Sequence, residues 1–208
     1  MQEPYKQLLI KIYSNSILNM KNTIDTLAKN LHLTEDYVRG LCNLMKKQGL
    51  ISESEGEFKL TDIGRSKIKV VLAGGVFDII HPGHIFALSS AKNLGDVLVV
   101  VIARDKTVMR NRGRSPLNNE EQRLELVKSL KLVDAAILGS EGSIFESVMK
   151  IKPDMIALGY DQKHDESELE KEAKRHGLSL KFVRLGTKMP DIKSSKIIKN
   201  RKEIIGEF

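Results

Sequence analysis

The sequence predicts an α/β protein in which a doubly wound parallel sheet follows a smaller helical domain. Beyond residue 67, short apolar runs alternate with amphipathic segments, which is the pattern of parallel strands joined by crossover helices. Before residue 67, apolar residues recur at helical spacing and a short hairpin pattern follows them. We therefore expect one domain at residues 1–66 and a second at residues 67–208.

The first part of the chain is expected to form three helices and a hairpin. A helical stripe covers residues 4–18, and Thr23 and Thr34 are suited to cap the second and third helices. A turn at Glu55-Gly56 separates two short predicted strands. Three helices followed by a small hairpin resemble a winged helix-turn-helix domain.

A winged helix invites a DNA-binding interpretation, because its third helix would carry polar side chains suited to a groove. These side chains are Arg39, Asn43, Lys46, Lys47 and Gln48. Residues 1–66 hold nine Lys or Arg against eight Asp or Glu, and this balance argues against strong phosphate binding. A packing or dimerisation module is the equally weighted alternative, and a homodimer is the expected assembly.

The positive charge of the chain is concentrated in its second part. The net charge is +7, and residues 67–208 carry 25 basic against 19 acidic side chains. This excess fits a polyanionic nucleotide at least as well as a nucleic acid. No apolar run approaches the ~20 residues that a membrane-spanning helix needs. With no signal-peptide pattern at its start, the chain is expected to be cytoplasmic, without a membrane partner.

Cysteine usage excludes two classes of site. The single cysteine, Cys42, excludes an internal disulfide and a cysteine-based zinc site. Its neighbours Leu41, Leu44 and Met45 are apolar, so we expect a buried structural thiol.

The segment 69–90 organises the second part. Val70–Ala73 is a short apolar run suited to a buried strand. Gly74 and Gly75 are expected to end that strand and to let the backbone approach a ligand closely.

Two histidines follow at the predicted start of a helix. Pro82 fits the first helical turn, so His81 and His84 flank the helix N-terminus. Free N–H groups and the helix dipole favour an anion there, and two imidazoles suit a phosphate whose charge grows during a reaction. The alternative without a functional role is a capped helix with two polar surface histidines. The strand and glycines that precede the pair favour the functional interpretation.

The stretch GGVFDIIHPGH at residues 74–84 resembles the GxFDxxHxGH signature of the cytidylyltransferase-like nucleotidyltransferases. The resemblance covers roughly residues 68–205 and implies a Rossmann-like HxGH nucleotidyltransferase fold. It also implies attack by a phosphorylated acceptor on the α-phosphate of a nucleoside triphosphate, with release of pyrophosphate.

Within this family the sequence is similar to the archaeal FAD synthases. The motifs that carry this similarity are GVFDIIHPGH, ARDKTV, KPDMIALGYDQ and SSKII. They imply an FMN adenylyltransferase that converts ATP and FMN to FAD and pyrophosphate.

Three alternatives stay open. One is a CTP-dependent cytidylyltransferase for glycerol 3-phosphate or a related phospho-alcohol, and another is an adenylyltransferase for a sugar phosphate. The cytidylyltransferases proper carry a compact R-T-E-G-I-S stretch, whereas here LGTKMPDIK separates Arg184 from Ser194. The third alternative, from a different class, is a DNA-binding regulator that senses a nucleotide or flavin.

Two further segments are suited to phosphate. Residues 104–114, RDKTVMRNRGR, are expected to form a basic loop at the carboxyl end of a strand, where Gly113 would let the loop close over a ligand. Ser194, Ser195 and Lys196 begin the last predicted helix, where hydroxyls and a cation can hold phosphates. As alternatives, the loop is merely solvated and Ser194 is simply an N-cap.

Together with these patterns, the resemblance implies individual roles. The catalytic residues are expected to be His81, His84, Arg112 and Arg114. The nucleotide is expected to contact Gly75, Val76, Phe77, Asp78, His81, His84, Asp161, Ser194, Ser195 and Lys196. The acceptor or its phosphate is expected to contact Asp105, Lys106 and Arg123. Mg²⁺ is expected to bridge the triphosphate, largely through water and phosphate oxygens, and no dedicated metal-ligand set is visible in the sequence.

Overall fold

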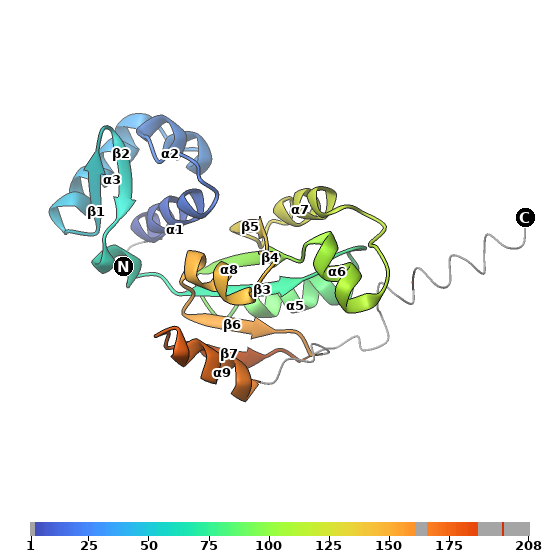
Figure 1. Cartoon of the computed structure of the whole chain (residues 1–208). Helices are drawn as coiled ribbons and strands as arrows, with labels where there is room; N and C mark the ends of the chain where they lie inside the picture. The colour runs from blue at the N-terminus through green and yellow to red at the C-terminus, as the bar shows by residue number, and fades with distance from the viewer. Residues whose placement is uncertain (1–2, 161–165, 187–196, 198–208) are drawn as a thin grey trace, which may run out of the picture.

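A five-stranded parallel sheet forms the body of the protein, in the order β5-β4-β3-β6-β7. The computed structural model describes residues 3–160, 166–186 and 197 (Figure 1). The strands are β3 (Val70–Gly75), β4 (Val97–Ile102), β5 (Ala135–Leu138), β6 (Met155–Leu158) and β7 (Lys181–Arg184). The order reverses between β3 and β6, so the crevice at the carboxyl ends of these two strands is the expected ligand site.

Helices cover both faces of the sheet, as the alternating pattern predicts. They are α5 (Pro82–Lys92), α7 (Glu120–Lys128), α8 (Ile144–Ile151) and α9 (Glu166–Arg175), while α6 (Asp105–Arg112) follows β4 and belongs to neither core cluster. Buried residues of α5 and α7 pack on one face, with Val71, Ala73 and Val100. Buried residues of α8 and α9 belong to the core on the other face, with Leu72 and Val99. The prediction of a Rossmann-like, doubly wound α/β fold is confirmed.

The central strands are buried on both faces. Every residue of β4 is buried, and Leu72 of β3 pairs with Val99 of β4 and Ile156 of β6. Runs of β-branched residues suit such strands, because neither face meets solvent.

The chain begins with an N-terminal module, which we define as residues 3–66. Its elements are α1 (Glu3–Ile17), α2 (Ile24–Leu31), α3 (Glu35–Lys47), β1 (Ile51–Ser54), β2 (Glu57–Leu60) and α4 (Asp62–Arg65). Thr23 and Thr34 cap α2 and α3 as predicted, each accepting a backbone N–H three residues later. Glu55 and Gly56 turn the hairpin with positive φ angles of 54° and 75°. The predicted elements are present, while the winged-helix identity and the boundary at residue 66 stay predictions.

The N-terminal module and the sheet share one hydrophobic core. Helix α1 lies against β4 and β5, and its buried Leu8 and Leu9 belong to the same cluster as Val97, Val99 and Ala135. In Figure 1, α1 lies beside the sheet, while the hairpin of the module points away from it. Helix α1 therefore covers part of this face of the sheet, as the crossover helices cover the rest.

One local expectation was wrong. Residues 104–114 are not a loop, because α6 occupies most of the segment and Gly113, with a φ of 67°, is its C-cap. Strand β3 includes Gly74 and ends at Gly75, so the expected end of the strand at this glycine pair is confirmed.

Two smaller expectations have clear outcomes. Cys42 is buried, and this burial raises the pKa of its thiol to about 11, as expected for a structural thiol. Among the described residues, no helix combines the length and apolar character that crossing a membrane requires.

Candidate active site

The paired histidines lie at the N-terminus of α5, at the carboxyl end of β3. His81 occupies the N-cap position in extended conformation, and its side chain does not cap the helix. The backbone N–H of His84 donates to the His81 carbonyl at 2.9 Å, and the ring centroids lie 3.9 Å apart. The helix start therefore carries two adjacent imidazoles at the positive end of the α5 dipole.

Phe77 shapes the turn that leads to these histidines. It has a φ of 54°, which is uncommon for a bulky residue, and its side chain is buried. The Phe77 ring lies 5.2 Å from the His84 ring, centroid to centroid. A Cβ on Gly75 would come within 2.7 Å of a Phe77 ring carbon, so Gly75 makes room for this ring. Gly74 has no such role, since a Cβ there would lie 3.7 Å from the nearest atom, the Val101 carbonyl oxygen.

Asp78 anchors the segment that follows α6. Its side chain is buried, and Oδ1 accepts the backbone N–H groups of Leu117 at 2.8 Å and Asn118 at 3.0 Å. The other oxygen, Oδ2, lies 3.9 Å from Nη1 of Arg114. The carboxylate is thus turned toward protein groups, and the expected nucleotide contact of Asp78 stays a prediction.

Arg123 is fully enclosed. Its side chain is 0% exposed and donates to the carbonyls of Val76 at 2.5 Å and Ala103 at 2.7 Å. It also donates to the Asn118 carbonyl at 3.0 Å and to Oδ1 of Asp105 at 2.6 Å. The Arg123 side chain therefore has protein partners on several sides, and its predicted substrate contact stays a prediction. This guanidinium holds together the loops that follow β3 and β4, because a buried arginine is tolerated only with its donors satisfied.

A second ion pair extends this arrangement to β5. Arg104 donates to Oε1 of Glu120 at 2.6 Å and to the Gly139 carbonyl at 2.9 Å. Glu120 Oε2 also accepts the backbone N–H of Asp105 at 2.7 Å. Burial by itself would raise the pKa of Glu120, but the hydrogen bonds from Asp105 and Arg104 outweigh it and hold this pKa below its ordinary value. Asp105 contacts Arg123 and Glu120 within this network, and its expected contact with the acceptor stays a prediction.

A pocket of about 280 Å³ lies at the carboxyl ends of the strands, between α6 and α8. Its floor is apolar and includes Leu72, Val101 and Ile156. Its polar rim consists of Arg104, Thr107, Asn111, Arg112, Ser140 and Ser147. We call it the α6–α8 pocket. An apolar floor with a few convergent polar groups is the usual form of a small-molecule site.

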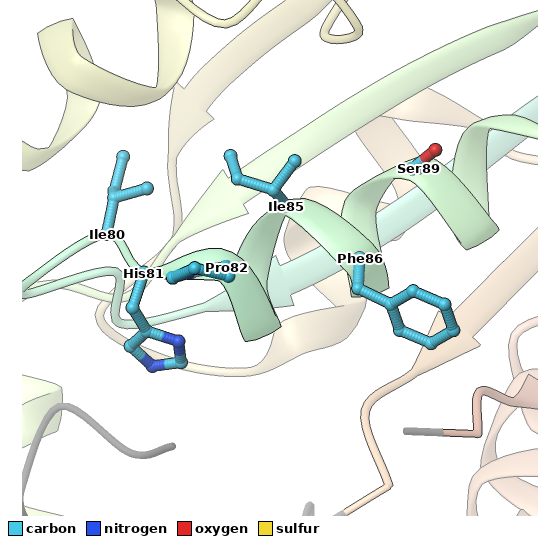
Figure 2. Close-up of a pocket in the computed structure, with 6 residues that line it drawn as sticks. All are labelled: Ile80, His81, Pro82, Ile85, Phe86 and Ser89. Carbon is cyan, nitrogen blue, oxygen red and sulfur yellow. The ribbon is translucent and has the colours of Figure 1, made fainter. Parts of the chain in front are cut away.

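A second, open groove of about 630 Å³ runs along the start of α5 (Figure 2). We call it the α5 groove. It is lined by Ile80, His81, Pro82, Ile85, Phe86 and Ser89. The side chains of His81 and Phe86 point to the same side of the helix in Figure 2, away from Ile80. One catalytic candidate therefore borders this groove.

The structure brings together only part of the predicted site. His81 and His84 are adjacent, and Val76 and Arg112 line the α6–α8 pocket. Lys106 is exposed and ion-paired with Glu141 at 3.0 Å. The predicted contacts Asp161, Ser194, Ser195 and Lys196 lie outside the described residues.

Apart from the arginines, sequence reasoning missed the polar residues that line the pocket, which are Thr107, Asn111, Ser140 and Ser147. Thr107 and Asn111 are four residues apart, which places them on one face of a helix, but only if residues 105–112 are recognised as helical. Ser140 lies two residues after the end of β5, where site residues of parallel sheets are expected. Within the described part of the chain, no group of three or more His, Cys, Asp or Glu residues could hold a metal ion.

Comparison with known proteins identifies the family. A family model described as cytidylyltransferase-like matches residues 72–200. An FAD synthase from Thermoplasma volcanium is 49% identical over 138 residues, which are 66% of this chain and 96% of that protein. One from Methanothermus fervidus is 55% identical over 138 residues, 64% of this chain and 94% of that protein.

A solved structure agrees with this result. The crystal structure of a protein from Thermoplasma volcanium, titled a lipopolysaccharide core biosynthesis protein, superposes with a TM-score of 0.56 at 51% identity. It covers 58% of this chain and 98% of the other. With a parallel sheet that reverses order beside a histidine pair at a helix start, and relatives aligned over nearly their whole length, this chain belongs to the cytidylyltransferase-like family of nucleotidyltransferases.

Proposed function

We propose that the chain is an FMN adenylyltransferase, which joins ATP and FMN to give FAD and pyrophosphate. The observation that carries this proposal is the identity of 49% and 55% to proteins named FAD synthase, over 96% and 94% of their length. The histidine pair that the chemistry needs is present at the start of α5.

The reaction is an in-line displacement at phosphorus. An oxygen of the FMN phosphate forms a bond to the α-phosphorus of ATP, the bond to the β-phosphate bridging oxygen breaks, and pyrophosphate leaves with that oxygen. The protein supplies position and charge stabilisation rather than covalent chemistry. His81 and His84 would donate hydrogen bonds to α-phosphate and bridging oxygens as negative charge develops.

The two substrates would occupy opposite sides of β3. Residues after β4 line the α6–α8 pocket, whose apolar floor suits the flat ring of FMN. Arg112 at the rim would neutralise a substrate phosphate, and Arg114 would assist from its place beside Asp78. The triphosphate would lie at the start of α5, where the N-terminus of the helix favours anions.

Other contacts and the cofactor follow from the family resemblance. Asp161, Ser194, Ser195 and Lys196 would bind the nucleotide, and Mg²⁺ would bridge the triphosphate through water and phosphate oxygens. A cytoplasmic location is part of the same proposal. Titration with a chelator tests the metal: turnover should stop and return with added Mg²⁺, and full activity in excess chelator would contradict this role.

DNA binding and a homodimer are proposals for the N-terminal module. The outer face of α3 carries Arg39 and Lys46, and both are ion-paired, with Glu35 at 3.9 Å and Glu53 at 2.5 Å. This partial neutralisation supports a protein contact more than a phosphate contact. Solution mass and salt-dependent DNA affinity distinguish the two, because phosphate contacts weaken steeply with salt.

One assay tests the proposed activity. Purified protein is supplied with ATP or CTP against FMN, glycerol 3-phosphate and a sugar phosphate, and pyrophosphate and FAD are measured. FAD formation from ATP and FMN should dominate. Productive turnover of CTP with glycerol 3-phosphate alone would leave the family correct and contradict the proposed substrates.

A further inference from the structure

Helix α8 connects the α6–α8 pocket to the N-terminal module. It has eight residues, Ile144–Ile151, and a helix of that size is about 12 Å long. Ile144 and Ser147, in its first half, line the pocket. Its last residue, Ile151, is in contact with the N-terminal module. The two ends of one short helix therefore meet two different parts of the protein.

The N-terminal module satisfies the carbonyls at the end of α8. The hydroxyl of Tyr13 donates to the Ile151 carbonyl at 2.6 Å in a buried hydrogen bond. Arg65 donates to the Lys152 carbonyl at 2.7 Å and to Oδ2 of Asp154 at 2.9 Å. The last carbonyls of a helix have no partner within the helix, so removing a buried partner leaves them unsatisfied.

Further interactions stabilise the contact between the N-terminal module and the C-terminal end of α8. The Arg65 guanidinium lies 5.4 Å from the centroid of the Tyr13 ring. Asp154 Oδ2, which accepts from Arg65, also accepts the backbone N–H of Val70 at 2.7 Å, at the start of β3. Lys152 has a φ of 49°, an unfavourable conformation for a lysine that the surrounding contacts hold in place.

A shift of the C-terminal end of α8 also shifts its N-terminal end, which lines the α6–α8 pocket. Phe145, Val148 and Ile151 are buried in the core cluster that includes α1. The start of the helix is fixed by a capping box between Ser143 and Glu146. A short, capped helix packed along its length responds as a unit, because packed cores do not deform continuously.

We propose that Tyr13 and Arg65 are positioning residues for the acceptor site: by holding the C-terminal end of α8, they set the wall of the α6–α8 pocket that binds FMN. This inference rests on the proposed function. Both residues lie outside the segment that matches the family model, residues 72–200. The N-terminal module thus contributes to substrate affinity without contacting the substrate.

The test compares variants that remove different contacts between the N-terminal module and the rest of the protein. Tyr13→Phe removes one hydroxyl, and Arg65→Lys removes the forked donor. Lys6→Ala is the matched control, because the Lys6–Asp96 ion pair of 2.5 Å joins the module to the segment before β4 and not to α8. Tyr13→Phe and Arg65→Lys should each raise the KM for FMN about fivefold, with kcat and the KM for ATP changed less than about twofold. Lys6→Ala should leave all three values near those of the wild type.

A second measurement tests whether binding at the α6–α8 pocket affects the N-terminal module. FMN alone should slow amide hydrogen exchange at the C-terminal end of α8 and in α1, since binding at one end stabilises the other. An unchanged KM for FMN in both variants, together with unchanged exchange in α1, would overturn the inference while wild-type FAD synthesis upholds the proposed function. Wild-type protein that forms no FAD would overturn the proposed function and the FMN assignment together. If Tyr13→Phe does not fold, Arg65→Lys decides the kinetic comparison.

Discussion

The Nη2 atom of Arg123 lies 2.6 Å from Oδ1 of Asp105, and the arginine side chain is sealed from solvent. Three backbone carbonyls, from Val76, Ala103 and Asn118, accept the remaining hydrogen bonds. A single side chain from α7 thus sets the relative position of the loops after β3 and β4. The first of these loops leads to the histidine pair at the start of α5, and the second leads into α6, which ends at Arg112.

Arg123→Lys should lower both stability and turnover, because one ammonium cannot replace a fork that serves four acceptors. We expect a loss of about 1–3 kcal/mol in the free energy of unfolding, the cost of leaving buried hydrogen-bond acceptors unsatisfied, and at least about a tenfold fall in kcat. Urea unfolding and steady-state kinetics measure both, with exposed Arg110→Lys as the control. Wild-type stability with a raised KM alone would instead indicate a substrate contact.

Removal of either imidazole should affect the chemical step. His81→Ala and His84→Ala are expected to lower kcat by about 100-fold or more while ATP still binds, since the lost contact matters mainly in the transition state. Single-turnover kinetics and ATP binding separate the two effects. His176→Ala, a change in a half-exposed histidine beside Phe145, is the matched control. Near-normal turnover in both active-site variants would refute the proposed role.

The two basic residues near the end of α6 should differ. Both arginines are exposed, but only Arg112 lines the α6–α8 pocket. Arg112→Ala should raise the KM for FMN by about tenfold, in line with a charge-assisted hydrogen bond. Arg110→Ala should change it less than about twofold. Equal effects of the two substitutions would indicate a general field of positive charge rather than a specific contact.

Neighbouring glycines of β3 offer another matched pair. Gly75→Ala places a methyl group 2.7 Å from the Phe77 ring, so the ring must move and His84 loses its neighbour. We expect a loss of about 1–3 kcal/mol in stability, typical of overpacking, and a reduced kcat. Gly74→Ala meets only an ordinary contact at 3.7 Å and should be nearly neutral. Thermal unfolding of both variants measures the difference, and equal tolerance of both would show that Phe77 does not need this space.

Acid should reduce the contribution of the Glu120 carboxylate to the stability of the fold. Its pKa in the folded protein is below the ordinary value of 4.5. A depressed carboxyl pKa stabilises the fold above the ordinary value, and this contribution is lost as pH falls through the lower folded value. Urea unfolding of wild type and Glu120→Gln from about pH 7 to about pH 3 should show a stability difference that shrinks toward acid. A constant difference would mean that the charge of Glu120 contributes nothing.

The strands and the histidine pair could be predicted because their signals are local. Val97–Ile102 is a continuous apolar run made mostly of β-branched residues, and Pro82 marks the helix start beside His81. Helix α6 escaped prediction because Val108 is its single fully buried residue, so its sequence shows no apolar stripe.

Other features depend on partners that are distant in sequence. A charged residue such as Arg123 is expected at the surface, and its burial follows only from carbonyls that the fold brings to it. The stripe of α1 predicts that Leu8 and Leu9 are buried, but not that β4 and β5 help to cover them. The hydrogen bonds that Asp78 accepts from Leu117 and Asn118 could likewise not be predicted, because these partners are about 40 residues away in the sequence.

The core that α1 shares with the sheet has a consequence for the life of the protein in a cell. Without residues 1–66, the apolar side chains of Val97, Val99 and Ala135 would lose their cover, and exposed apolar patches promote aggregation. The N-terminal module and the sheet should accordingly unfold in one thermal transition. A protease should then cleave only chains in which both parts are unfolded. A substitution in α1, far from the histidines, would then reduce enzyme abundance through degradation.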